Sequence, residues 1–106
     1  MPGSFLVVLT TLPNLAQSRR LTRLILRKKL AACINIVGPA RSFFWWKGKV
    51  DSAKEYLLLI KTRQSQFNRL RTFLEKHHPY SVPEIIALPV TKGNASYLNW
   101  LRANVG

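Results

Sequence analysis

Hydrophobic residues fall into short continuous runs separated by polar segments, and these runs predict the strands of a sheet. Runs rich in β-branched residues are typical of buried strands, and they cover residues 5–11, 31–37, 50–62 and 84–90. The centre of the third run is apolar enough to predict burial on both faces. Residues 41–46 continue the second strand after an interruption or bend at Gly38-Pro39.

Between these runs, apolar residues recur every three or four positions, which predicts helices. The first helix is expected to begin at Asn14, whose side chain can cap it, and to run to about Lys29. Ser65 is the expected cap of a second helix that continues to about Lys76. Asn94 is expected to cap a last short helix.

The resulting order is strand, helix, long hairpin, helix, strand and a final helix, which predicts an α+β fold. Two helices on one face of an antiparallel sheet form the split βαβ, or ferredoxin-like, arrangement. Lys47-Gly48-Lys49 is the expected hairpin turn. The length of 106 residues predicts one domain over residues 1–106. The overhanging part of the hairpin carries the aromatic run 43–46, which would expose an apolar edge in a monomer. We therefore expect an oligomer.

Composition narrows the class and the compartment. The hydrophobic content of 47% is that of a folded protein. No apolar run approaches the roughly 20 residues that cross a bilayer, so no membrane association is expected. The first five residues show no basic region before an apolar one, which predicts no secretory signal. A single cysteine allows no internal disulfide and fits a reducing compartment. The predicted location is cytoplasmic.

The charge of the chain is unusually positive. Seventeen lysines and arginines against four acids give a net charge of +13, and the isoelectric point is about 11.1. Such a field attracts nucleic acid at low salt, so a basic nucleic-acid-binding ferredoxin-like module is the alternative function. RNA-binding versions of this fold carry aromatic residues within an RNP-type sequence, and the segment after Gly48 contains none. Binding of a specific nucleic acid is therefore not expected.

The two histidines of the chain stand side by side, and prolines stiffen the segment that follows them. Titratable groups on a stiff connection are typical of a functional site. Copper(II) favours imidazole and carboxylate donors, and copper(I) favours thiolate. His77, His78, Glu84 and Cys33 supply these donor types. Neighbouring side chains on a regular element point apart, so both histidines can bind one ion only if the turn distorts.

Five short motifs along the chain match one protein family in order and spacing. They are Lys29-Leu-Ala-Ala-Cys33-Ile-Asn35, Trp46-Lys-Gly48-Lys49, Glu55 followed by Leu58-Leu-Ile-Lys61-Thr62, His78-Pro-Tyr80 with Pro83-Glu84-Ile85, and Tyr97-Leu-Asn-Trp100-Leu101. Through them the chain resembles the CutA divalent-cation-tolerance proteins over residues 5–102.

The resemblance implies a ferredoxin-like protomer and a homotrimer in which long hairpins join the sheets of neighbouring subunits. The family is linked to tolerance of copper and other divalent cations, and its animal members to acetylcholinesterase anchoring. The trimer is similar to that of the PII-type signalling proteins, which bind small ligands in clefts between subunits. No enzymatic activity comes with the resemblance, and the chain shows no GxSxG or phosphate-loop motif. We therefore expect no enzyme, and no cofactor required for folding.

The resemblance also assigns candidate metal ligands. Family members with a copper site use a histidine pair at the positions of His77 and His78, together with a cysteine near the end of the first strand. This chain has Thr10 at that strand position, so a copper(II) site here is expected to bind modestly. Structural roles are the alternatives: a helix-end position for His77, a structural contact for His78, and core packing for Cys33.

The candidate residues of a ligand cleft between subunits are Lys61, Tyr80, Glu84, Trp46 and Trp100. A buried lysine is costly without a partner. Lys61 is therefore expected either to pair with a carboxylate such as Glu84 or to face a small anionic ligand. Packing in the core or at an interface is the alternative role for the two tryptophans.

Overall fold

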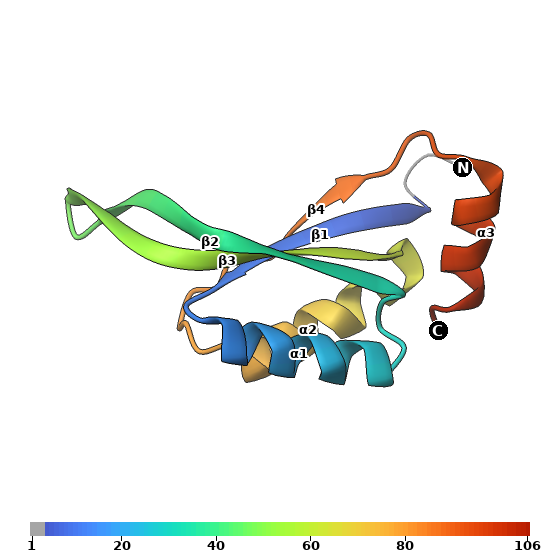
Figure 1. The fold of residues 1–106 in the computed structure, drawn as a ribbon, viewed down its shortest axis with the longest axis horizontal. Helices are drawn as coiled ribbons and strands as arrows, with labels where there is room; N and C mark the ends of the chain where they lie inside the picture. Colours follow the sequence, from blue (N-terminus) through green and yellow to red (C-terminus); the bar gives the residue numbers. More distant parts are fainter. Residues whose placement is uncertain (1–3) are drawn as a thin grey trace.

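The predicted ferredoxin-like fold is confirmed by the computed structural model, which describes residues 4–106. The prediction of no secretory signal rests on an N-terminal segment whose first three residues lie outside this range. A four-stranded antiparallel sheet has the strand order β2-β3-β1-β4, and two helices cover one of its faces (Figure 1). The elements are β1 (Phe5–Leu12), α1 (Leu15–Arg27), β2 (Cys33–Trp46), β3 (Lys49–Arg63), the 3-10 turn η1 (Gln64–Gln66), α2 (Phe67–His77), β4 (Ile86–Pro89) and α3 (Ala95–Ala103).

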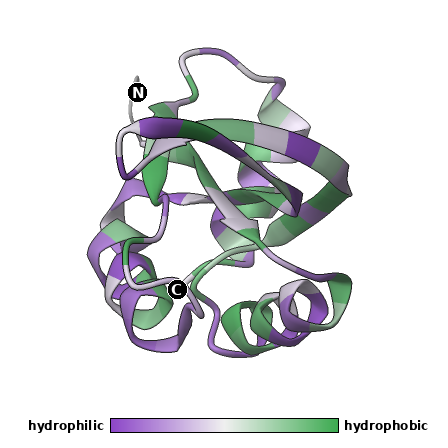
Figure 2. Ribbon diagram, turned by 90° about the vertical axis from the view of Figure 1, so that its left-hand side faces the viewer, coloured by the Kyte–Doolittle hydropathy of each residue, from purple (hydrophilic) through white to green (hydrophobic). Residues whose placement is uncertain are grey.

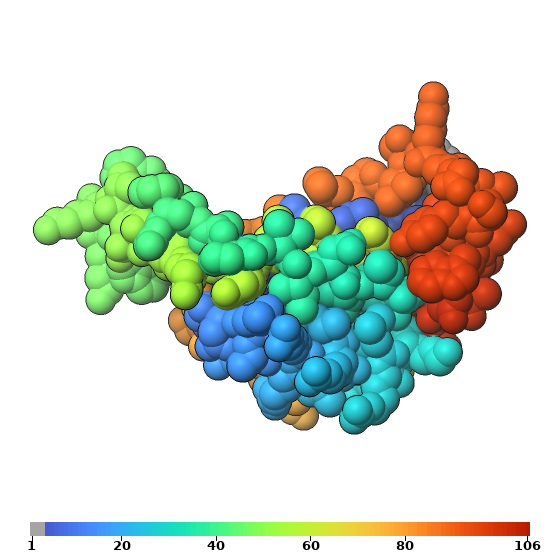
Figure 3. Space-filling model, in the orientation of Figure 1, coloured from blue at the N-terminus to red at the C-terminus, as the bar shows by residue number. Residues whose placement is uncertain are grey.

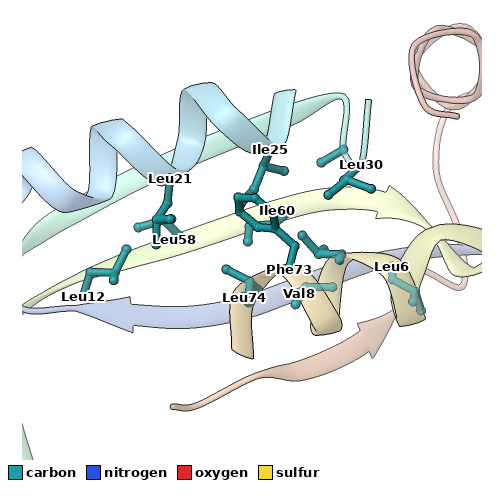
Figure 4. Packing of buried hydrophobic residues seen from close by; sticks show 12 residues of the cluster. Leu6, Val8, Leu12, Leu21, Ile25, Leu30, Leu58, Ile60, Phe73 and Leu74 are labelled. Atoms are coloured by element: carbon teal, nitrogen blue, oxygen red, sulfur yellow. The ribbon is translucent and has the colours of Figure 1, made fainter. Parts of the chain in front are cut away.

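The core lies between the sheet and the two helices (Figure 4). Alternate residues of a strand point to opposite faces, and the fully buried ones on β1 and β3 all point toward the helices. Leu21 and Ile25 of α1 and Leu70 and Leu74 of α2 meet them there. Thr62 is also buried on this side, where its hydroxyl donates to the Leu30 carbonyl oxygen at 2.7 Å.

Of the three predicted capping residues, one caps its helix as expected and two do not. Asn14 caps α1 as predicted, because its side-chain oxygen accepts from the Gln17 amide at 2.8 Å. The predicted cap at Ser65 is wrong: β3 continues to Arg63, residues 64–66 form η1, and α2 begins only at Phe67. The sheet delays the helix because β1 still pairs with β3 at Arg63. Asn94 stands at the start of α3, but its side chain contacts Ser96 rather than capping the backbone.

The last strand is shorter than the predicted 84–90. β4 spans Ile86–Pro89 and pairs only with β1, so it is an edge strand. Proline has no amide proton to donate to a ladder; Pro83 precedes the paired segment and Pro89 is its last residue. Residues 78–85 are therefore free to make contacts outside the sheet.

The long hairpin bends and then extends beyond the rest of the sheet. Its register shifts between Val37 and Ala40, which confirms the bend expected at Gly38-Pro39. The turn consists of Lys47 and Gly48, both with positive φ (51° and 77°), as in the two-residue turns that match strand twist. We call residues 40–46 and 49–55 the arm; in Figure 3 the arm stands clear of the body of the protein.

The face of the sheet opposite the helices is apolar but only half-buried. The centre of β3 was expected to be buried on both faces, but it is buried only on the helix-facing side, because none of residues 4–106 covers the centre of the other side. This surface, which we call the open face, carries Val7, Leu9, Leu57, Leu59, Ile86 and Leu88. At one end α3 packs on Phe5 through Leu101. No helix within residues 4–106 is long and apolar enough to span a membrane.

Candidate functional site

His78 is fixed between the end of β1 and the loop that follows α2. The Tyr80 amide donates to its Nδ1 at 3.1 Å. That nitrogen therefore carries a lone pair, and Nε2 carries the proton. Nε2 donates to the Thr11 carbonyl oxygen at 2.9 Å, and the Thr10 hydroxyl oxygen lies 3.2 Å from it. Both ring nitrogens are used by the protein itself.

Burial keeps His78 neutral. Desolvation lowers its pKa below the ordinary value of 6.5, and this outweighs the opposing effects of the Thr11 hydrogen bond and the charge of Glu55. A neutral imidazole is the form that can bind a metal. To do so here, however, Nε2 would have to give up its bond to Thr11 or Nδ1 its bond to Tyr80.

Tyr80 joins this loop to the arm. Its hydroxyl donates to Glu55 Oε2 at 2.8 Å, and Glu55 is only 8% exposed. Burial, followed by the hydrogen bond to Glu55 and its negative charge, raises the pKa of Tyr80 to about 12. The rings of Tyr80 and His78 also lie close together, with centroids 5.1 Å apart and planes tilted by 45°. The chain Thr11–His78–Tyr80–Glu55 thus ties β1, the loop and the arm together.

A hollow of about 740 Å³ lies between the arm and this loop. Its walls combine aromatic and apolar side chains with carboxylates. Three of the predicted cleft residues line it: Trp46, Tyr80 and Glu84. The remaining lining residues are Thr11, Ser42, Phe43, Phe44, Asp51, Ala53, Glu55, Pro79, Ser81 and Val82.

The hollow holds most of the negative charge of the protein. The chain has four acidic residues, and three of them, Asp51, Glu55 and Glu84, line this one surface. The fourth, Glu75, is on α2 and pairs with Arg71 at 2.9 Å. In a chain of net charge +13, the hollow is therefore a local exception that favours cations.

The other two predicted cleft residues lie at the opposite end of the molecule. Lys61 is six residues from Glu55 on the same face of β3, about 20 Å at roughly 3.3 Å per residue. Its ammonium lies 5.9 Å from the centre of the Tyr97 ring, and it makes no ion pair with Glu84 in the described structure. Trp100 is 46% exposed on α3. One protomer does not bring the five residues together.

The predicted metal ligands also lie apart. Cys33 pairs with Lys61 across β2 and β3, on the open face, whereas His78 approaches β1 beside Thr10, which points toward the helices. His77 ends α2, half-buried, with its ring 4.4 Å from that of Phe73. Within residues 4–106 no three His, Cys, Asp or Glu residues converge closely enough to hold a metal ion.

Two carboxylates of the hollow were not singled out from the sequence as site residues. Glu55 was noted only as part of a family motif, yet it anchors Tyr80. The sequence did contain a signal for Glu55, because a carboxylate within an apolar strand needs a hydrogen-bonding or charged partner when it is buried. Asp51 carried no such signal, because only the fold places it in the same hollow as Glu84.

Comparison with known proteins identifies the family. The profile of the family described as "CutA1 divalent ion tolerance protein" matches residues 6–104. "Divalent-cation tolerance protein CutA" of Thermus thermophilus is 44% identical over 94% of this chain and 97% of its own length. "Protein CutA 1, chloroplastic" of Oryza sativa is 47% identical over 92% of this chain.

This chain spans only 55% of the length of that rice relative, whose name places it in the chloroplast, so the family is not confined to the cytoplasm. The crystal structure of CutA1 from Oryza sativa superposes with a TM-score of 0.95 at 44% identity and covers 99% of this chain and 96% of its own. Family profile, relatives and fold agree over nearly the whole chain: it belongs to the CutA1 divalent ion tolerance family.

Proposed function

We propose that the protein acts in divalent-cation tolerance as a homotrimer that binds a cation, and a small anionic ligand, in clefts between its subunits. The observation that carries this proposal is an uncovered apolar arm beside a hollow that holds three of the four acids of the chain. The names of the family and of its Thermus thermophilus member, which refer to divalent ions, support the same function. The proposal is one of binding, not catalysis, in a reducing compartment such as the cytoplasm.

The uncovered apolar surface supports assembly. Phe43 and Trp45 on the arm are 72% and 76% exposed, and Val50 is 60% exposed. By strand register these three residues are on the same side of the hairpin as the helices, beyond the point where the helices end, and the open face is a second uncovered apolar surface on the other side. Exposed apolar patches of this kind mark protein interfaces. Burying several such side chains is worth several kcal/mol at ~25 cal/mol per Å².

Assembly also supplies what one chain lacks. Trp46, Tyr80 and Glu84 line the hollow at the arm end, whereas Lys61 and Trp100 lie at the α3 end. An arm that reached the open face of a neighbour would bring the two ends together. We propose that this contact forms the cleft, with Lys61 toward an anionic ligand and the carboxylates toward a cation.

Copper(II) is the cation that the available donors fit best. Imidazole and carboxylate oxygen both suit it, and His77, His78 and Glu84 lie on or next to the same loop. Thr10, where copper-binding relatives are expected to have cysteine, does lie beside His78, so the soft donor is absent at that point. Cys33 is a ligand only if a neighbouring subunit brings it to the histidines. Binding is therefore expected to be modest and to show no thiolate charge-transfer band.

The test is calorimetric titration of copper(II) into the wild type and into His77→Ala, His78→Ala, Cys33→Ala and Glu84→Gln, with the mass of each variant checked. Glu75→Gln is the control, because it removes the same charge outside the hollow. We expect the histidine and Glu84 variants to bind at least ~10-fold more weakly. Wild-type binding should weaken only below pH 6.5, because burial lowers the pKa of His78 from that ordinary value. Unchanged affinity in these variants would exclude the metal site and leave the cleft as an anion pocket built on Lys61.

A further inference from the structure

The outer side of α1 carries a row of arginines that the proposed cleft does not use. Arg19, Arg20, Arg23 and Arg27 are all exposed. Their spacing of one, three and four residues places them on one side of the helix. Lys28 and Lys29 follow directly and are exposed too. We call these six residues the α1 basic row. Its arginines span eight residue steps, about 12 Å at ~1.5 Å per residue.

The row has no acidic partner. Within residues 4–106 the one ion pair is Arg71–Glu75 on α2, and residues 15–29 contain no acid at all. Arginines four apart, as in Arg19–Arg23 and Arg23–Arg27, repel each other and weaken a helix. An ordinary solvated helix surface alternates the sign of its charges. A linear polyanion would remove this repulsion.

The surroundings of the row indicate which polyanion fits. Figure 2 shows α1 and α2 side by side beneath the sheet, and Leu26, 37% exposed, is the one exposed large apolar residue on these two helices. A membrane-surface helix needs an apolar side to insert, and α1 buries its own in the core. With no exposed aromatic ring on either helix for base stacking, contact is limited to phosphates.

We propose that the α1 basic row binds the phosphate backbone of duplex nucleic acid independently of sequence. The planar guanidinium group matches a phosphate with two parallel hydrogen bonds, and four of the six cations are arginines. A row of charges along one helix fits the regular line of phosphates on a duplex better than it fits a flat surface. The row lies on the opposite side of the sheet from the open face, so binding does not depend on the proposed trimer or its cleft.

The experiment measures fluorescence anisotropy of a labelled random-sequence duplex of about 25 base pairs, titrated at several salt concentrations. The wild type is compared with the triple variant Arg20→Gln, Arg23→Gln, Arg27→Gln. The matched control is Lys47→Gln, Lys54→Gln, Lys92→Gln, which removes the same net charge at exposed positions outside the helices. Circular dichroism confirms the fold of both.

We expect the α1 variant to bind at least ~10-fold more weakly at low salt, and its salt slope to shrink by ~0.9 for each phosphate that the protein no longer neutralises. For the control, the decrease in the logarithm of the affinity for the duplex should be less than half of the decrease for the α1 variant. Equal weakening in the two variants would show that net charge, not this row, attracts the duplex, and would overturn the proposal. It would also be overturned if phosphatidylserine vesicles, but not the duplex, distinguished the two variants, since the row would then recognise a membrane.

Discussion

At the scale of single residues, His78 has the clearest role. Its two ring nitrogens hold β1 and the loop together, and its neutral form is the one that fits. Protonation would turn Nδ1 from an acceptor into a donor facing the donor amide of Tyr80. The residue therefore makes the loop beside the hollow sensitive to acid.

This predicts a stability change on the acid side. Because the folded-state pKa of His78 is lowered, the unfolded chain binds more protons as pH falls below about 6.5, and stability present above that pH is lost. Urea unfolding at pH 8 and pH 5.5, at one protein concentration, measures it. His78→Gln should be less stable at pH 8 but lose less on acidification, whereas His77→Gln should follow the wild type. Identical pH dependence in all three proteins would contradict this role.

Tyr80 gives a second prediction. Tyr80→Phe leaves the buried Glu55 carboxylate without its hydrogen bond, which should cost ~1–3 kcal/mol in the free energy of unfolding. The wild type should also lose stability as pH rises from about 10 toward 12, because the folded-state pKa of Tyr80 is about 12, and the variant should not. Tyr56→Phe is the control. A Tyr80→Phe protein as stable as this control would show that the contact with Glu55 contributes nothing.

Residue roles were only partly predictable from the sequence. The family motifs pointed to His78, Tyr80 and Glu84, and the structure places all three around one loop. They did not reveal that both nitrogens of His78 would be occupied, because a hydrogen bond to Thr11, 67 residues away, leaves no trace in local sequence. Lys61 and Trp100 were grouped with the loop, yet within one chain they lie at the far end.

At the scale of elements, the hairpin depends on two glycines for different reasons. At Gly38 φ is also positive, at +156°, and a Cβ would in addition lie 2.8 Å from Tyr56 Cδ2 and 3.0 Å from the Glu55 carbonyl oxygen. At Gly48 the space is open but φ is +77°. The first glycine permits close packing of two strands; the second permits the turn.

Alanine substitutions should separate these effects. Gly38→Ala forces backbone to move and should cost ~1–3 kcal/mol, whereas Gly48→Ala should cost only ~1 kcal/mol for its left-handed conformation. Thermal unfolding at matched concentration ranks the two. A larger destabilisation by Gly48→Ala would mean that the bend tolerates a side chain and that the turn limits stability.

The bounds of helices and strands were predicted well where the local sequence determines them, and less well where pairing between distant strands determines them. Asn14 starts α1 through its own side chain, so local sequence located the start. Ser65 failed as a cap because β1 holds β3 straight to Arg63, a contact made by residues far apart in the chain. β4 was overestimated for the same reason: its neighbours in sequence are apolar, but only Ile86–Pro89 pairs with β1 as a strand, and Val90 adds one backbone hydrogen bond to Phe5.

At the scale of the whole molecule, two apolar surfaces remain uncovered, the arm and the open face. Both were anticipated in part: the aromatic run predicted an exposed edge, and the apolar centre of β3 predicted burial on two faces. A single protomer buries only one of those two faces of β3, the one that packs against the helices. The amino-acid pattern thus describes a sheet that is more buried than a single chain makes it, which is the basis for proposing an assembly.

The central claim is that this assembly exists and is held by apolar contacts. Light scattering at low-micromolar concentration, in low and in high salt, tests it directly. We predict a mass three times the 12.1 kDa of the chain, unchanged by salt because the interface is apolar. The double variant Phe43→Ser, Trp45→Ser should lower the mass, and Leu26→Ser, an exposed apolar residue outside the arm, should not. A wild-type mass of 12.1 kDa would contradict the account and remove the basis for a site between subunits.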